Sequence, residues 1–373
     1  MGISEPIIAP TNAAASLTTQ DRLAKFDAEL LAHPVISSVI HEAMSLLRRP
    51  AIPIIEVVGP TGIGKTTFVK KVHAALLDHY GPAMRGNPGL IPVVRAEAPS
   101  PDSGSFHWGD FYKRFLRAAQ EPMIENKALE FIDGRSDKKS STFAELRWSM
   151  EQCIRQRGIK VVIIDEAQHL CKVTNARRLQ DQMDLIKSLS SLTGVQFVMV
   201  GTYELLSLLN QNGQLARRTR CIHFHRYDFE KPDDRLALAI LLTMFESRMP
   251  VQAGGVLTRN QEYIYERSLG CIGILKDWLR LACNRAVDAR RDALTLADLQ
   301  AAALPEESLL QILAEILEGE RSIGGWTQKG DDLRDKLGLK PLKSPGLPLA
   351  KAKKPVVRLA VGQRKPTRDP VNV

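Results

Sequence analysis

A glycine-rich loop that follows a buried apolar segment limits the fold of this chain more than any other feature. Residues 59–67 read Gly-Pro-Thr-Gly-Ile-Gly-Lys-Thr-Thr and fit the pattern G-x-x-x-x-G-K-[ST] at every position. The preceding residues 52–58 are typical of a buried parallel strand, and residues 66–77 are typical of a helix. Strand, loop and helix in this order predict an α/β unit that binds phosphate.

The loop also predicts how a nucleoside triphosphate would bind. Glycines allow positive φ, so backbone N–H groups can surround phosphates at the N-terminus of the next helix. We expect Lys65 to reach the β and γ phosphates of ATP, and the Thr66 hydroxyl to bind Mg²⁺. A plain connecting turn is the structural alternative. The predicted ATP-binding residues of the loop are Gly59, Pro60, Thr61, Gly62, Ile63, Gly64, Lys65, Thr66 and Thr67.

A second motif delivers two carboxylates at the end of a strand. Residues 161–164 are β-branched and typical of a buried strand, and Asp165 and Glu166 follow at its carboxyl end. We expect Asp165 to contact Mg²⁺, and Glu166 to orient and deprotonate the attacking water. The motif therefore predicts ATP hydrolysis, with a helix-capping pair of acids as the structural alternative.

The order of predicted elements defines the fold class. Strands are predicted at residues 52–58, 91–94, 161–165, 195–200 and 222–224, with helices between them. This pattern predicts an α/β fold with a five-stranded parallel sheet and helices on both faces. A helical lid follows, and its last predicted helix covers residues 309–317. The expected parts are a disordered segment 1–20, a nucleotide-binding domain 21–232, the lid 233–318 and a flexible tail 319–373.

Charge and cysteine content indicate the compartment and the possible partners of the protein. The net charge of +9 lies entirely in residues 336–373, which hold ten Lys or Arg and one acid, Asp369. Proline and charge predict an extended tail, either a solubilising terminus or an arm that contacts nucleic acid or an acidic partner. The five cysteines show no disulfide or zinc pattern, and no secretory signal or membrane-length apolar run stands out. We therefore expect a cytoplasmic protein without a membrane partner.

The order of elements resembles AAA+ ATPases, and several segments resemble one family of them more closely. GPTGIGKTT, VVIIDEAQHL, FVMVGT, QLARRTR and GCIGILKDWL look like segments of the TnsC/TniB family of transposition regulators, relatives of the MuB target-DNA ATPase. The resemblance covers roughly residues 20–300. It implies an ATP-dependent homo-oligomer, a ring or helical filament on double-stranded DNA, that links a target-selection protein of TniQ/TnsD-like type to a transposase.

The resemblance also implies roles for single residues. Thr202 matches the polar sensor of the γ-phosphate or the water, although a strand-end hydroxyl can simply cap the next helix. Arg218 matches the arginine that reaches into the nucleotide site of a neighbouring subunit, and Arg217 and Arg220 are close enough to compete for that role. The lid arginine common in AAA+ proteins is missing here, because Gly273 takes its place; Lys276 is a possible substitute, but close helix packing explains Gly273 better.

The resemblance also implies DNA contact through the segments between the second and third strands. The candidate residues are Lys113, Arg114, Arg117, Lys138 and Lys139, each of which can equally be a solvated surface residue. No base-reading module is evident in the sequence, so binding should involve the DNA backbone and depend strongly on salt.

Two other classes of function fit the same core. One is an initiator-type replication loader or a secretion-associated ATPase. The other is a scaffold in which ATP holds subunits together with little hydrolysis. The paired acids Asp165 and Glu166 argue against loss of hydrolysis, but they allow slow turnover.

Overall fold

The computed structural model describes residues 19–28, 33–49, 51–101, 104–124, 143–173, 176–209, 218–328 and 336–337. The candidate DNA contacts Lys138 and Lys139, the finger candidate Arg217, and most of the predicted terminal segments lie outside these ranges. The chain separates into two compact units, residues 1–320 and 321–373. The sheet and the candidate site belong to the first.

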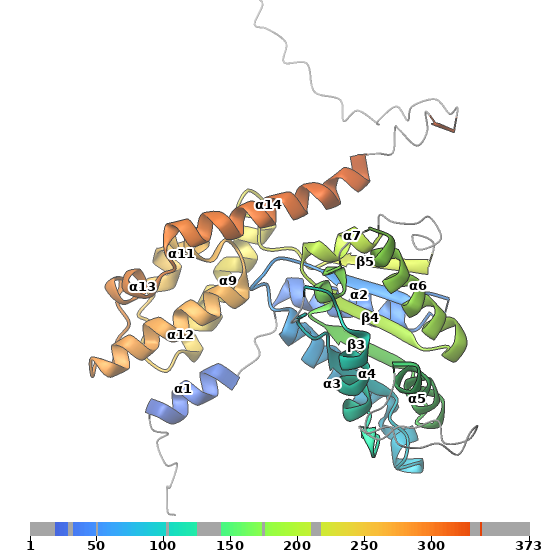
Figure 1. Cartoon of the computed structure of the whole chain (residues 1–373). Helices are drawn as coiled ribbons and strands as arrows, with labels where there is room; N and C mark the ends of the chain where they lie inside the picture. The colour runs from blue at the N-terminus through green and yellow to red at the C-terminus, as the bar shows by residue number, and fades with distance from the viewer. Residues whose placement is uncertain are drawn as a thin grey trace, which may run out of the picture. The chain divides into compact units, whose positions relative to one another are not determined.

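The described part of the first unit is built on one parallel sheet of five strands in the order β2-β3-β4-β1-β5 (Figure 1). Strand β1 lies between β4 and β5, and its Val58 pairs with Gly201 of β4 and with His223 of β5. Neighbouring strands therefore end at one common edge, which we call the carboxyl edge. The predicted parallel sheet is confirmed, and its strands are β1 (Ile54–Val58), β2 (Val93–Glu97), β3 (Val161–Asp165), β4 (Gln196–Gly201) and β5 (Thr219–His223).

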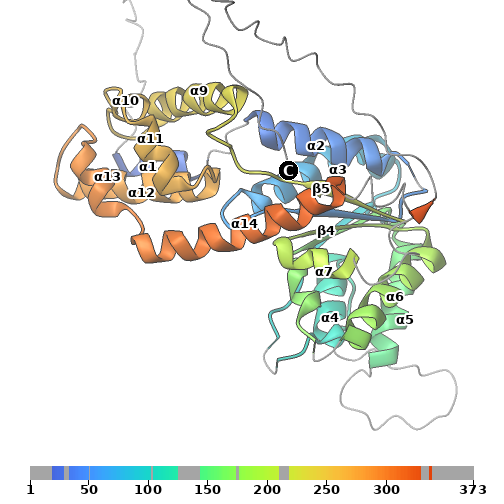
Figure 2. The ribbon, with the colours of Figure 1, turned by 90° about the horizontal axis from the view of Figure 1, so that it is seen from above.

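Helices cover both faces of this sheet (Figure 2). Every residue of β1, β3 and β4 is buried as a result, which explains why these strands read as continuous apolar runs. On one face lie α2 (Pro34–Leu47) and α3 (Lys65–Gly86). On the other lie α4 (Trp108–Ala118), α5 (Phe143–Gln156), α6 (Ala176–Thr193) and the short α7 (Leu206–Leu209).

The chain is helical after β5, which confirms the predicted helical part that follows the sheet. An N-terminal helix, α1 (Thr19–Ala28), packs against these helices: the Phe26 ring lies 6.2 Å from the Phe245 ring, and Lys276 Nζ donates to the Asp27 carbonyl at 2.9 Å. The helices of the lid are α9 (Pro232–Arg248), α10 (Val256–Arg259), α11 (Gln261–Ser268), α12 (Ile272–Asp288), α13 (Leu296–Ala302) and α14 (Glu306–Gln328).

Several predicted boundaries were wrong: α3 continues past residue 77 to Gly86, and β5 begins at Thr219 rather than at residue 222. The second strand begins after Pro92, because proline has no N–H to donate to the ladder, and it continues through the charged residues Arg95 and Glu97. The last helix extends beyond residue 317 to Gln328. Glu320, near the middle of this helix, accepts two hydrogen bonds from Arg226 at 2.9 and 3.3 Å.

Within the described ranges, no helix is both long enough and apolar enough to cross a lipid bilayer. All five cysteines are free thiols.

Candidate nucleotide-binding site

The phosphate loop connects the end of β1 to the start of α3 at the carboxyl edge. Gly62 and Gly64 have φ values of 74° and 109°, a left-handed conformation that side chains disfavour. This turn places Lys65 and Thr66 in the first turn of α3, where free backbone N–H groups and the helix dipole attract an anion. The Gly59 N–H donates to the Gly201 carbonyl at 3.2 Å, so the loop is tied directly to the end of β4.

Lys65 is buried within its own loop. Its ammonium donates to the Gly59 and Pro60 carbonyls at 3.1 and 2.8 Å. Burial lowers the pKa of Lys65 to about 8, although the carboxylates of Glu166 and Asp165 favour its charged form. The side chain is thus held at the loop by partners that phosphate oxygens can replace.

Asp165 ends β3 and is held by an ion pair that the sequence did not reveal. Its Oδ2 accepts from Arg95 of β2 at 3.0 Å, and its Oδ1 accepts from the Glu166 N–H at 3.1 Å. Burial raises the pKa of Asp165, and Arg95 opposes that rise. A charged residue directly after an apolar segment was the only sequence signal for Arg95, and this signal equally fits a solvent-facing position.

Glu166 and Thr202 lie on either side of a third residue, Gln168. The Gln168 Nε2 donates to Glu166 Oε2 at 2.6 Å, and the Gln168 Oε1 accepts from the Thr202 N–H at 3.2 Å. Glu166 has a φ of 53° and precedes the short 3-10 helix Ala167–Cys171. The structure therefore brings the two predicted residues close together. It connects them through the Gln168 amide, to which the sequence analysis assigned no chemical role.

The lid contacts the phosphate loop through its backbone. The N–H groups of Gly273 and Ile274, in the first turn of α12, donate to the Gly62 carbonyl at 2.6 and 3.2 Å. A Cβ on Gly273 would lie 2.4 Å from that oxygen, so the close packing expected from Gly273 is present. Lys276 instead points to α1, where its ammonium also lies 5.8 Å from the centre of the Phe26 ring; the structure does not bring it to the loop.

Arg218 and Arg220 lie at the opposite side of the sheet, which we call the amino edge. Thr219 pairs with Ile54, the first residue of β1, whereas the phosphate loop follows its last residue. A strand of five residues separates the two edges, roughly 15 Å. Arg218 is exposed and donates to the Ser191 hydroxyl at 3.3 Å, and Arg220 donates to the Thr219 carbonyl at 3.0 Å.

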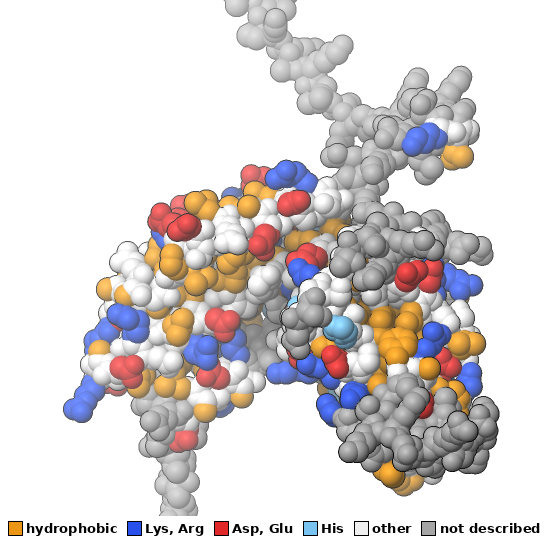
Figure 3. Space-filling view, viewed as in Figure 1, with side chains coloured by type: hydrophobic (Ala, Val, Ile, Leu, Met, Phe, Trp, Pro, Cys, Tyr) orange, Lys and Arg blue, Asp and Glu red, His pale blue; other side chains and the backbone are white. Residues whose placement is uncertain are grey.

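The candidate DNA contacts that can be placed lie on α4. Arg114 and Arg117 are exposed and Lys113 is half-buried, whereas Phe111, Phe115 and Leu116 are buried. Figure 3 shows Lys and Arg side chains scattered among acidic and polar ones across the visible face, for the residues drawn in colour.

The residues of the carboxyl edge fit ATP and Mg²⁺. Within the described part of the chain, the buried Thr202 Oγ1 has no hydrogen-bond partner, so a phosphate oxygen or a water would satisfy it. The Thr66 hydroxyl and the Asp165 carboxylate are hard oxygen ligands of the kind that Mg²⁺ prefers. Lys65 and the N-terminus of α3 supply the positive potential that phosphates need.

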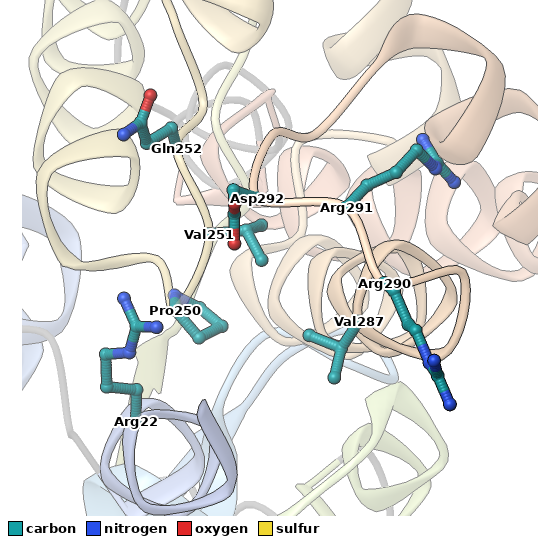
Figure 4. Close-up of a pocket in the computed structure, with 8 residues that line it drawn as sticks. All are labelled: Arg22, Pro250, Val251, Gln252, Val287, Arg290, Arg291 and Asp292. Carbon is teal, nitrogen blue, oxygen red and sulfur yellow. The ribbon is translucent and has the colours of Figure 1, made fainter. Parts of the chain in front are cut away.

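A separate pocket of about 410 Å³ lies between α1 and the lid and contains none of the predicted site residues. Figure 4 shows Arg22 directed into it, with Arg290 and Arg291 directed away. The Arg291 guanidinium is paired with Asp298, whose carboxylate accepts two hydrogen bonds from it at 2.6 and 2.5 Å. The pocket is lined by Arg22, Pro250, Val251, Gln252, Val287, Arg290, Arg291 and Asp292.

Comparison with known proteins agrees with this geometry at the level of the domain. Residues 52–209 match the sequence model of a family described as AAA domain, and this range extends from just before β1 to the end of α7. The match covers β1 to β4 and the helices between them, and the five-stranded sheet with the helical part that follows it has the AAA+ fold. Among curated protein sequences, none matches this chain.

Several solved structures have a similar chain path. The ADP form of the ORC2 protein of Aeropyrum pernix is 16% identical, with 74% of this chain and 70% of that one covered at a TM-score of 0.49. A Walker-type ATPase of Pyrococcus abyssi is 13% identical, with 86% and 89% covered at 0.46. Domain III of the Thermotoga maritima replication initiation protein DnaA is 14% identical, with 74% and 94% covered at 0.44. Shared function does not follow from likeness at this level.

Proposed function

We propose that this chain is an ATPase that assembles on double-stranded DNA, as a ring or a helical filament, and regulates DNA transposition. The observation that carries the proposal is the separation of two sets of residues. Lys65, Asp165 and Glu166 meet at the carboxyl edge, whereas Arg218 is exposed at the amino edge. One copy of the chain holds both halves of a hydrolytic site, but it cannot bring them together.

The carboxyl edge binds the nucleotide and prepares the water. Lys65 would exchange its two loop carbonyls for phosphate oxygens, and Thr66 and Asp165 would hold Mg²⁺, whose charge would offset that of the phosphates. Glu166 orients the attacking water and accepts its proton. Thr202, at the end of β4, directs its hydroxyl to the γ-phosphate or to that water.

The amino edge of a neighbouring copy completes the site. Its Arg218 stabilises the charge that develops as the γ-phosphoryl group is transferred. Hydrolysis then depends on assembly, and loss of the γ-phosphate weakens the contact between copies and promotes disassembly.

Contact with DNA is made through the phosphate backbone. Arg114 and Arg117 on the exposed face of α4 offer a few phosphate contacts per copy, so useful affinity requires several copies along the duplex. Lys113, Lys138 and Lys139 are the further candidates. Binding of this kind shows little sequence preference.

The role in transposition rests on the resemblance to the TnsC/TniB family. Four of the five resembling segments fall on the phosphate loop, β3, β4 and the start of α12, which are the parts that meet at the carboxyl edge. The partners would be a transposase and a target-selection protein of TniQ/TnsD-like type.

Electron microscopy of the full chain tests this proposal, with duplex DNA and a slowly hydrolysed ATP analogue. Rings or filaments that enclose DNA, form only with nucleotide, and disappear steeply as salt rises are expected. Assemblies on DNA that form equally well without nucleotide would contradict the dependence on ATP, whereas nucleotide-dependent assemblies with little ATP turnover would favour the scaffold. Monomers under all conditions would contradict a shared site and leave an AAA+ ATPase of the initiator or loader type as the better description.

A further inference from the structure

Gln168 occupies the junction of three segments of the site. It lies in the 3-10 helix that follows β3, and only 7% of it is exposed. Its side chain reaches the end of β4, where a Cβ on Gly201 would lie 2.6 Å from Gln168 Oε1. Gly201 in turn accepts a hydrogen bond from Gly59 of the phosphate loop. The absence of a side chain at Gly201 therefore lets the amide lie between the acid motif and the sensor strand.

The two hydrogen bonds of Gln168 determine the orientation of its amide. The Thr202 N–H can only donate, so it must face the amide oxygen. The ionised Glu166 carboxylate can only accept, so it must face the amide nitrogen. Both partners are thus satisfied in one orientation and unsatisfied in the flipped one.

The bond to Glu166 is the shorter of the two, at 2.6 Å against 3.2 Å. Hydrogen bonds to a charged acceptor are shorter and stronger than neutral ones. Because Gln168 holds Oε2 of Glu166, the other oxygen, Oε1, is left to accept a proton from a water. A residue that served only to hold the end of β4 would need only the contact with Thr202.

We propose that Gln168 is a positioning residue for hydrolysis, which fixes the Glu166 carboxylate and ties its orientation to the Thr202 segment. The inference rests on the proposed function, in which Glu166 acts on the attacking water. A shift of the Thr202 backbone on binding or release of the γ-phosphate would then move the Gln168 amide and, with it, the Glu166 carboxylate. The general base would be aligned only when the sensor strand is in its triphosphate position.

The test compares steady-state ATP turnover by full-length variants, together with their equilibrium affinity for ATP. Gln168→Met keeps the length of the side chain but removes both hydrogen bonds. We expect kcat to fall by about 30- to 100-fold, the scale of a misplaced catalytic group, with the Kd for ATP changed by less than about twofold. Gln182→Met removes another buried amide, on α6, and should leave kcat unchanged.

A double variant separates positioning from structural damage. If Gln168 acts through Glu166, adding Gln168→Met to Glu166→Gln should change the residual turnover by less than about twofold. Gln168→Glu provides a second variant should Gln168→Met not fold; it keeps an acceptor for Thr202 but has no N–H for Glu166, and the same fall in kcat is expected.

The outcomes distinguish this inference from the proposed function. Normal turnover by Glu166→Gln would remove Glu166 from the mechanism and overturn both. Loss of turnover in Glu166→Gln with a normal kcat in Gln168→Met, or effects that multiply in the double variant, would overturn the role of Gln168 alone.

Discussion

The carboxyl and amino edges of the same sheet differ in what they contain. At the carboxyl edge the phosphate loop, Asp165, Glu166 and Thr202 lie within one network of hydrogen bonds that also includes Arg95 and Gln168. At the amino edge Arg218 is exposed and contacts Ser191. The residues of the carboxyl edge are arranged to bind a ligand, whereas Arg218 at the amino edge presents its charge to solvent. Under the proposed function, a single chain supplies the residues that bind ATP, and the arginine finger comes from the amino edge of a second copy.

The largest expected effect tests the amino edge. Arg218→Ala should lower ATP turnover of the DNA-bound assembly by about a thousandfold, because an arginine that stabilises the transferring phosphoryl group contributes that much. Turnover measured at saturating ATP, with affinity measured separately, checks this. Arg220→Ala is the matched control on the same edge; if it lost turnover and Arg218→Ala did not, the assignment of the finger would move to Arg220.

The next effect tests the carboxyl edge alone. Lys65→Ala should weaken ATP binding by about a hundredfold, since hydrogen bonds from a charged donor to phosphate are lost. Equilibrium titration with a fluorescent ATP analogue measures this without any need for assembly. Lys70→Ala removes an exposed lysine from the same helix and should bind normally; equal weakening in both variants would indicate a general loss of positive charge.

The lid contact with the carboxyl edge predicts a smaller effect. Gly273→Ala places a methyl group against the Gly62 carbonyl, so the start of α12 must move away from the loop. The free energy of unfolding should fall by about 1–3 kcal/mol, as measured by denaturant titration. Gly109→Ala, in α4 where the added group meets open space, should not destabilise the protein. Equal stability of the two variants would show that the close packing is unimportant.

The smallest effect comes from Glu56, which lies in β1 between the two edges. It is fully buried, and burial raises its pKa well above 4.5. The unfolded chain releases this proton as pH rises above about 4.5 while the folded chain keeps it, so stability falls with rising pH up to the folded pKa. Glu56→Gln should remove that slope, about 1.4 kcal/mol per pH unit. Glu42→Gln, on the exposed side of α2, should keep it; a slope that survives Glu56→Gln would contradict the buried acid.

The sequence predicted the parallel sheet because its signals are local. Two motifs can be recognised from neighbouring residues alone, whatever the fold of the rest of the chain. They are the glycine loop between a strand and a helix, and the two acids after an apolar strand. Burial on both faces makes the strands continuous apolar runs, so their existence was clear even where the boundary of β2 was not.

The remaining features depend on contacts between distant residues. The role of Arg95 depends on its contact with Asp165, which lies seventy residues away in the sequence. The role of Gln168 depends on its contact with the end of β4. Lys276 was a candidate for the nucleotide, but it is engaged with α1, far from it in sequence. Glu320 of α14 is paired with Arg226, which is also distant in sequence. None of these pairings leaves a periodic pattern in a single sequence.

The central claim is that one hydrolytic site needs two copies of the chain, and mixing two inactive variants tests it directly. Glu166→Gln keeps Arg218 but lacks the general base, whereas Arg218→Ala keeps the base but lacks the finger. In an equal mixture assembled at random on duplex DNA, about one quarter of the sites combine an intact base with an intact finger. We predict that turnover in the mixture recovers to about a quarter of that of the unmodified protein. Turnover that stays at the level of the two variants alone would contradict a shared site.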